Sequence, residues 1–142
     1  MPRETFHSRE YQQGRRTLDP IVEIKLPSGG VTVESYVDTG CSSGLVFTKG
    51  QVQRLGLSLP EKFNDEPEPI GLADGTNIGA DFYCAEVELE GEKRPVFIVV
   101  LDPDMRLGRA EEADEMPLLG RGFIDHFDVL FSGIDKRLVF SK

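Results

Sequence analysis

The chain has few of the residues that build metal sites and disulfide frameworks. Its 142 residues include two cysteines, Cys41 and Cys84, two histidines, His7 and His126, and no tryptophan. Two cysteines do not make a disulfide framework, and a structural zinc site needs more soft ligands, usually in paired motifs. We therefore expect a protein of a reducing compartment that works without a metal or another cofactor.

Long apolar runs and clustered positive charge are also missing. No segment approaches the roughly 20 apolar residues of a membrane helix, and residues 1–16 contain no apolar stretch of the secretory-signal type. Acidic residues outnumber basic ones, 25 to 16, which gives a net charge of −9. Such a surface repels a phosphate backbone. We expect a cytoplasmic protein that binds no nucleic acid and has no membrane span.

The remaining composition is that of one globular domain. Hydrophobic residues make up 39% of the chain and charged residues 29%, as is usual for such domains. A chain of this length buries roughly 70% of its unfolded surface, enough for one core. Residues 1–19 are polar, charged and aperiodic, which predicts a mobile N-terminal arm. We expect the domain itself to span residues 20–142.

The segments that follow this arm alternate between apolar and polar residues, as half-buried strands do. Residues 21–26 and 31–37 flank a Pro-Ser-Gly-Gly turn and predict a β-hairpin. Residues 44–47 predict a further strand, which leads into a short helix over residues 48–55. Thr48 would cap this helix and Gly56 would end it.

The second half of the chain also predicts short strands. Turn signals at Asp74-Gly75 and Gly91 indicate two successive hairpins. The segments after them are an acidic loop (102–116), a short buried strand (117–120), a short helix (121–128) and a terminal hairpin (129–140). Mostly short strands with one or two short helices indicate a mainly β fold, either a barrel or a sandwich.

One carboxylate stands at an unusual place, at the end of a predicted core strand. Asp38 follows residues 31–37, and Thr39 and Gly40 come next. Two carboxyl groups that share one proton can activate a water and protonate a leaving amine, because like charges a few Å apart do not both ionise. A following glycine lets the backbone approach the carboxylate, and a threonine hydroxyl can bond to a second copy of the loop.

This chemistry needs two such loops, and the chain supplies one. The other Asp-Gly step near a strand, Asp74-Gly75, has no hydroxyl residue directly after the aspartate. If the chemistry is real, the second loop comes from another molecule. A two-fold homodimer is then required, in which Asp38 pairs with its symmetry mate.

Three segments together resemble a known family. The segment "YVDTGCSS" is similar to the hydrophobic-Asp-Thr-Gly-Ala-Ser/Asp signature of aspartic proteases, and "MPLLGRGFI" is similar to the second signature, in which two apolar residues precede Gly-Arg. "IGLADGTNIGADF" stands between them, where the family has its flap hairpin. Residues 20–142 thus resemble a retropepsin-type single-domain protease of clan AA, of the bacterial type. The resemblance implies a closed β-barrel of the acid-protease type, one lobe per chain.

The resemblance also implies a role for each matching residue. Asp38 would be the catalytic aspartate, Thr39 would grip the partner subunit, and Gly40 would lie against the substrate and the paired aspartates. The terminal hairpin would supply strands to the dimer interface. The substrate-binding residues would be Ser42, Leu72, Ala73, Asp74, Gly75, Thr76 and Asn77, and those that support the active-site loop would be Leu118, Leu119, Gly120 and Arg121.

The chain departs from the family pattern at three positions. Cys41 stands where the family usually has alanine, which places an oxidisable thiol beside the catalytic group. Arg121 is present, but Ser42 replaces its usual carboxylate partner, and Gly122 replaces the usual Asn or Asp. The ion pair that commonly steadies the dimer is thus altered, and we expect a weaker, concentration-dependent dimer.

Other interpretations of these residues stay open. Asp38-Thr39-Gly40 is also the pattern of an Asx-type turn after a strand, and Asp74-Gly75 is the pattern of a plain hairpin turn. Cys41 could act as a nucleophile with His126 as its base. Cys84, within "DFYCAEV", is expected to be a buried small hydrophobic residue. The acidic run at residues 111–115 fits a solvated loop better than a metal site.

Three functions are therefore weighed. The first is an aspartic endopeptidase that hydrolyses extended peptides as a homodimer. The second is a peptide-binding or dimerisation module of the same fold with weak or no catalysis. The third is an unrelated small β-barrel in which the signatures coincide by chance.

Overall fold

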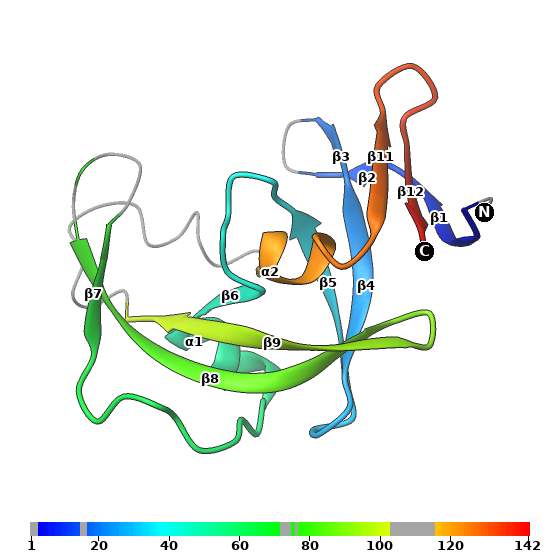
Figure 1. The fold of residues 1–142 in the computed structure, drawn as a ribbon. Coiled ribbons are helices and arrows are strands. Elements are labelled where there is room, and N and C mark those ends of the chain that lie inside the picture. Colours follow the sequence, from blue (N-terminus) through cyan, green and yellow to red (C-terminus); the bar gives the residue numbers. More distant parts are fainter. Residues whose placement is uncertain (1–2, 15–16, 72–74, 76, 103–115) are drawn as a thin grey trace.

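The fold is mainly β, with two short helices, as the sequence predicts (Figure 1). The computed structural model describes residues 3–14, 17–71, 75, 77–102 and 116–142. Among the helices in these residues, none has both the length and the apolar character to cross a bilayer.

The largest sheet has seven strands and curls around one core. In spatial order they are β4 (Ile21–Leu26), β5 (Val31–Val37), β10 (Leu118–Leu119), β6 (Leu45–Thr48), β9 (Glu92–Leu101), β8 (Asn77–Leu89) and β7 (Glu68–Gly71). Strand β4 also pairs with β8, at Lys25 and Glu88. Strand pairings therefore lead from β8 back to β4, and the two strands join at that residue pair.

The hairpin β4/β5 shows why the sheet buries one face. Its register places Ile24 opposite Val33 and Glu23 opposite Glu34. Ile24 and Val33 are buried, whereas Glu23 is exposed, because successive residues of a strand point to opposite faces. The hairpin that the sequence predicts over these two segments is confirmed.

Helix α1 (Lys49–Leu55) begins and ends at the predicted residues. The Thr48 hydroxyl accepts a hydrogen bond from the Gln51 N–H over 3.1 Å, and the Gln51 side chain accepts one from the Thr48 N–H over 2.8 Å. This reciprocal pair is a capping box, here formed by buried groups. Gly56 ends the helix in the left-handed conformation, with φ of 63°.

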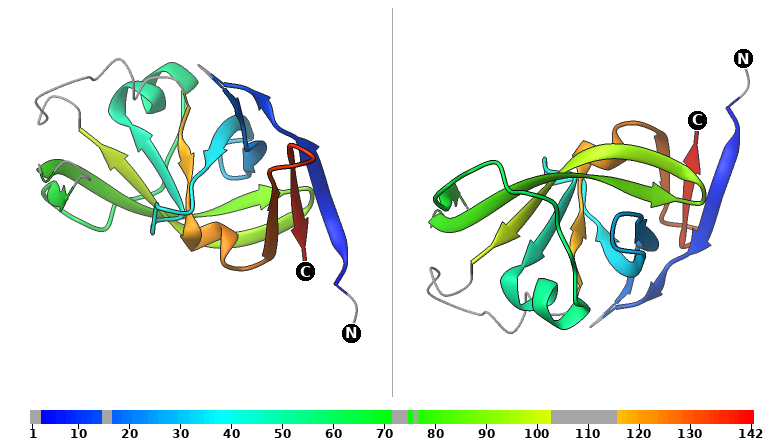
Figure 2. Two further views of the ribbon diagram at one scale, coloured as in Figure 1. Left: turned by 90° about the horizontal axis from the view of Figure 1, so that it is seen from above. Right: turned by 90° about the horizontal axis from the view of Figure 1, so that it is seen from below.

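A second sheet corrects the prediction for the N-terminal arm. Strand β1 (Thr5–Glu10) pairs with β12 (Arg137–Ser141), and β12 pairs with β11 (Asp128–Ser132). Figure 2 shows β1 alongside β12, with both chain ends on this side of the molecule. Residues 5–10 are therefore part of the fold, and β2 (Gln12–Gln13) and β3 (Leu18–Asp19) form a further small pairing.

Side chains as well as the backbone hold β1 in place. The Arg9 guanidinium donates to both carboxylate oxygens of Glu34, over 2.8 and 3.1 Å, and to the Ile21 carbonyl. The hydrogen bond to Glu34 raises the pKa of Arg9. On the other face, the Phe6 ring lies 5.1 Å from that of Phe127 and 6.1 Å from that of Phe140. The polar composition of residues 1–19 does not indicate the contacts of Arg9 and Phe6, because each contact depends on residues distant in the sequence.

The C-terminal elements match the prediction, with one shorter helix. Helix α2 (Arg121–Ile124) ends four residues before the predicted end at residue 128, and β11 begins at Asp128. Its buried Phe123 and Ile124 join the core, together with Phe140 of β12. The predicted terminal hairpin, β11/β12, is confirmed. Cys84, which the sequence predicts to be buried, is exposed.

Candidate active site

Strand β10 brings Asp38 to the centre of the large sheet. It lies between β5 and β6, parallel to β5 and antiparallel to β6. Asp38 directly follows β5, and its N–H donates a hydrogen bond to the Leu119 carbonyl over 2.9 Å. The chain that leaves β5 therefore passes across the end of β10 before it enters β6, and Asp38 sits at this crossing.

The Asp38 carboxylate is held through one of its oxygens. Oδ1 accepts a hydrogen bond from the Gly40 N–H over 2.9 Å, and the Cys41 N–H donates to the Asp38 carbonyl over 3.2 Å. This is an Asx-type turn, so the turn and the candidate catalytic group are one structure. Asp38 is half-buried, and Oδ2 accepts no hydrogen bond from the described residues. That oxygen remains available to a group from outside the chain.

Thr39 and Gly40 lie at the exposed tip of the loop. Within the described part of the chain, the Thr39 hydroxyl makes no hydrogen bond. A Cβ atom at Gly40 would lie 3.2 Å from Asp38 Oδ1. This distance is shorter than an ordinary Cβ contact, so a side chain at position 40 would strain the loop. The tip therefore presents a free hydroxyl and an uncovered backbone beside the carboxylate.

The start of α2 supports the rest of the loop. Three successive backbone N–H groups donate to it: Gly120 to the Gly44 carbonyl over 2.9 Å, Arg121 to Cys41 over 2.8 Å, and Gly122 to Ser43 over 3.1 Å. The first N–H groups of a helix have no partner within the helix, and here the loop carbonyls satisfy them. Leu119, fully buried, completes the support from β10.

Two glycines of this support have no room for a side chain. A Cβ at Gly120 would lie 2.2 Å from the Ser43 carbonyl oxygen and 2.7 Å from that of Cys41. At Gly122 it would lie 2.7 Å from the Gly44 nitrogen. The replacement of the family's usual Asn or Asp by Gly122 thus coincides with a very close approach of α2 to the loop.

Arg121 and Ser42 stand at positions where the family has an ion pair, and here neither residue takes that role. The Arg121 Nε donates to Asp125 Oδ2 over 3.2 Å, one helical turn away, and both side chains are 58% exposed. Ser42 is exposed as well. The guanidinium therefore pairs with the residue that follows its own helix, and an exposed pair of this kind contributes little to stability.

The predicted flap tip falls mostly outside the described residues, which exclude Leu72, Ala73, Asp74 and Thr76. Its flanks are described: β7 pairs with β8 from Glu68 and Ala80 to Gly71 and Asn77. Gly75 is exposed and has φ of 86°, a value that a hairpin turn often requires of glycine. The predicted hairpin is therefore present, and Gly75 and exposed Asn77 lie at its outer end.

A pocket of about 220 Å³ joins the Asp38 loop to the outer end of this hairpin. Gly40, Cys41, Ser42 and Ser43 line one wall, and Ile70 and Gly71 of β7 line another. Val46, Val99, Leu101 and Leu118 supply apolar surface between them. The structure thus brings together, around one hollow, two segments that the sequence separates by about thirty residues (40–43 and 70–71).

The Cys41 thiol and His126 do not form a nucleophile–base pair. Burial raises the pKa of Cys41, the hydrogen bond to the Ser43 carbonyl opposes the rise, and the negative charge of Asp38 adds to it. The protonated thiol is a poor nucleophile. His126 is exposed and its ring lies against Phe127, and no hydrogen bond joins it to Cys41 within the described residues.

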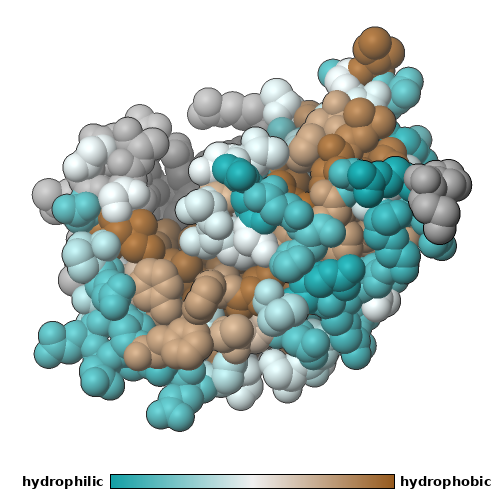
Figure 3. Space-filling model, viewed as in Figure 1, coloured by the Kyte–Doolittle hydropathy of each residue, from teal (hydrophilic) through white to brown (hydrophobic). Residues whose placement is uncertain are grey.

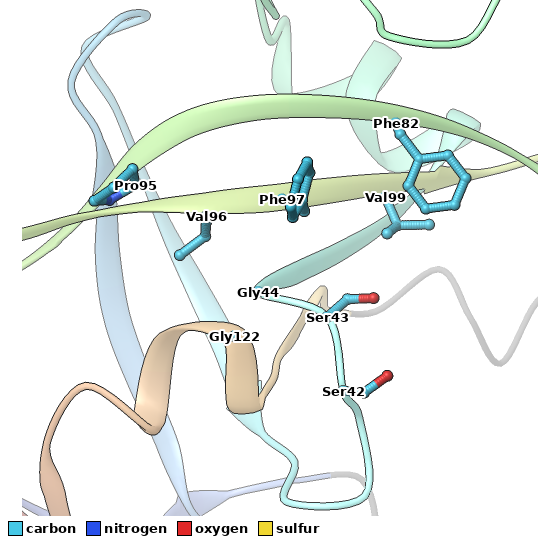
Figure 4. A pocket seen from close by; sticks show the side chains of 9 residues that line it. All are labelled: Ser42, Ser43, Gly44, Phe82, Pro95, Val96, Phe97, Val99 and Gly122. Carbon is cyan, nitrogen blue, oxygen red and sulfur yellow. The ribbon is translucent and has the colours of Figure 1, made fainter.

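A second hollow, of about 420 Å³, adjoins the loop and was not predicted (Figure 4). Phe82 of β8 and Phe97 of β9 project toward it from above, and Ser42 and Ser43 line it from the loop. One signal was present in the sequence: residues 95–101 are apolar at every position, so β9 presents apolar side chains on both faces.

Comparisons with known proteins show the fold. No family model matches the chain, and no curated protein matches it. Among solved structures, the EIAV protease in complex with the inhibitor HBY-793 is similar, with a TM-score of 0.56 and 16% sequence identity. The match covers 81% of this chain and 93% of that chain. The chain therefore has a fold like that of a retroviral protease, with the Asp38 loop at its central crossing.

Proposed function

We propose that the protein is an aspartic endopeptidase that acts as a homodimer. The observation that carries the proposal is the Asp38 loop, which combines an exposed Thr39-Gly40 tip with a carboxylate that the described residues hold through Oδ1. The retroviral-protease fold supports the proposal, because it supplies the support from β10 and α2 and a hairpin opposite the loop. We place the protein in the cytoplasm, as a bacterial-type retropepsin.

The second half of the site comes from a partner subunit. One carboxylate cannot both activate a water and protonate the leaving amine in the same step, whereas two that share a proton can. In Figure 1 the loop after β5 and the turn of hairpin β11/β12 point to the same side of the molecule. Leu130 and Ile134 of that hairpin are 59% and 96% exposed. A second copy on this side would cover both and bring its own Asp38 to the loop.

In the dimer, each structural feature of the loop has a task. The bond from Gly40 orients Asp38 so that Oδ2 faces the partner carboxylate, and the free Thr39 hydroxyl bonds to the partner loop. A water held between the carboxyls attacks the scissile carbonyl as the unprotonated carboxylate takes its proton. The protonated carboxyl polarises that carbonyl, and a proton then passes to the leaving amine.

The substrate is an extended peptide. The 220 Å³ pocket lies between the Asp38 loop and β7, where a peptide in strand conformation can bond through its backbone. As part of this proposal, the curled sheet is a closed β-barrel. Ser42, Gly75 and Asn77 then contact the substrate.

A second candidate is a peptide-binding module of the same fold with weak or no catalysis. The ion pair between Arg121 and Asp125 favours it, because the arginine is engaged away from the loop that it would otherwise steady. The two candidates differ in one measurable property, the hydrolysis of a bound peptide.

Substitution of Asp38 tests the proposal. The wild-type protein should cleave members of a mixed peptide library, and Asp38→Asn should lose this activity by a factor of 10³ or more, since the general base is gone. Sedimentation should show a dimer for both. Asp65→Asn, an exposed carboxylate outside the site, is the control and should keep full activity. Cleavage by Asp38→Asn at the wild-type rate would refute the assignment.

A further inference from the structure

The 420 Å³ hollow lies under the outer face of hairpin β8/β9, next to the candidate active site (Figure 4). Phe82 pairs with Val99, and Cys84 pairs with Phe97. Residues directly opposite each other in an antiparallel pair share one face of the sheet, so these four side chains form one surface. Phe82, Phe97 and Val99 of this surface line the hollow.

This surface keeps aromatic side chains in solvent. Phe97 is 57% exposed, whereas its neighbours Val96 and Ile98 are 4% and 0% exposed. Phe63, 64% exposed, packs edge-on against Phe97 with ring centroids 5.7 Å apart. Figure 3 shows the corresponding band of hydrophobic surface over β8 and β9. Two exposed phenylalanines in contact form an apolar patch that a ligand can cover.

The lining of the hollow specifies the chemistry of that ligand. Of the described residues that line it, none carries a charged side chain, and the polar side chains are those of Ser42 and Ser43. Its volume of about 420 Å³ falls within the range of small-ligand pockets, roughly 300–1,000 Å³. The hollow therefore suits a bulky, neutral, apolar side chain.

The hollow adjoins the candidate cleft. Ser42, Ser43 and Val99 line both this hollow and the 220 Å³ pocket beside Asp38. Gly44, at its inner wall, follows Asp38 by six residues, so the chain between them spans at most roughly 20 Å. An extended peptide covers that length with about six residues. A peptide that passes Asp38 can therefore reach the hollow without leaving the protein surface.

We propose that this hollow is a distal specificity site, which binds an aromatic or large aliphatic side chain of the peptide substrate within about six residues of the scissile bond. Phe97 is its specificity-determining residue, since its ring forms the exposed wall. The inference rests on the proposed endopeptidase function and names the class of substrate: peptides with a bulky apolar residue away from the cleavage point.

Digestion of a mixed library of blocked dodecapeptides tests the inference. Cleaved peptides should be enriched in Phe, Tyr, Leu or Met at one position beyond the residues next to the scissile bond. Phe97→Ala should reduce kcat/KM for a peptide with Phe at that position by roughly tenfold. The reduction should be much smaller for the same peptide with Ser there. Phe97→Leu should retain most of the preference, and Leu55→Ala, an exposed leucine of α1, should retain all of it.

The outcomes separate the inference from the proposed function. Cleavage without a distal preference, or with the same preference in Phe97→Ala, overturns the distal site and leaves the endopeptidase standing. If nothing is cleaved, fluorescence anisotropy of the labelled Phe and Ser peptides tests the site directly. Tighter binding of the Phe peptide than of the Ser peptide, with this difference lost in Phe97→Ala, supports the site. Equal binding of the two peptides overturns it. Dissociation of the dimer by Phe97→Ala would assign the surface to a second copy instead and also overturn the inference.

Discussion

The Asp38 loop and the small sheet β1–β12–β11 are attached to the molecule by different kinds of contact. The loop is held by backbone N–H groups of residues 120–122, at glycines where a Cβ would meet backbone atoms. The small sheet is tied to the large one by side chains, among them Arg9 on Glu34. Where two backbone segments approach this closely, an added side-chain atom cannot be accommodated. An attachment through side chains can instead be weakened one contact at a time.

The largest effect should come from a side chain placed in the loop support. In Gly120→Ala the new Cβ would lie 2.2 Å from the Ser43 carbonyl oxygen, so the backbone of the loop or of α2 has to move. We expect a loss of about 3 kcal/mol or more in the free energy of unfolding, by analogy with overpacked cores. Urea denaturation followed by circular dichroism measures it.

Gly133→Ala is the matched control, because no atom lies within 4 Å of the Cβ that it adds. Its stability should stay within about 0.5 kcal/mol of the wild-type value. Equal stability of Gly120→Ala and Gly133→Ala would show that the Asp38 loop accommodates an added methyl group as readily as an open turn does. The contrast between the tightly packed loop and the small sheet would then be wrong.

A smaller effect should follow from removal of the anchor of β1. Arg9→Met keeps most of the side-chain length but loses the two bonds to the Glu34 carboxylate. Because the Glu34 side chain is 42% exposed, solvent screens the pair, and we expect a loss of about 1 kcal/mol. The loss should shrink in 1 M salt. Thermal unfolding at low and high salt checks both.

Arg137→Met is the control for Arg9. Its contact with Glu10 is longer, at 4.0 Å, and more exposed, so its stability should hardly change. A loss as large as that of Arg9→Met would mean that general surface charge, and not the anchor to Glu34, stabilises the small sheet.

The smallest effect concerns the thiol within the loop. Burial raises the pKa of Cys41, so the folded state holds its proton to higher pH than the unfolded chain does. The associated stability is complete below the unfolded pKa of about 9.0 and falls as pH rises through the folded value. At pH 8, iodoacetamide should therefore label exposed Cys84 well before Cys41. Mass spectrometry follows both thiols, and equal labelling rates would contradict the burial of Cys41.

Local signals in the sequence predicted much of the fold. The hairpin β4/β5 and the caps of α1 at Thr48 and Gly56 are correct because alternation and capping depend on neighbours along the chain. The short β10 is correct for a similar reason, since an apolar pair before a glycine marks a buried strand. The family resemblance added the expected positions of Asp38 and of the residues around Gly120.

Other features depended on contacts between distant segments. Residues 5–10 are polar apart from Phe6, yet β1 pairs with β12 because an edge of that strand is open to it. Cys84 was predicted to be buried from its apolar neighbours, but its strand turns it outward, opposite exposed Phe97. The arginine of the second signature pairs with Asp125, the C-cap residue of α2.

By itself, the sequence determined the strand and turn pattern, the caps of α1 and the aspartate with its Thr-Gly neighbours. All of these follow from interactions over a few residues, which any chain with the same local sequence can make. The tertiary structure alone decided that β10 and α2 hold the Asp38 loop, that the described residues bond only one oxygen of its carboxylate, and that Phe97 borders a hollow beside it. Those features arise where segments far apart in the chain pack together, and side-chain identity along one segment does not encode such packing.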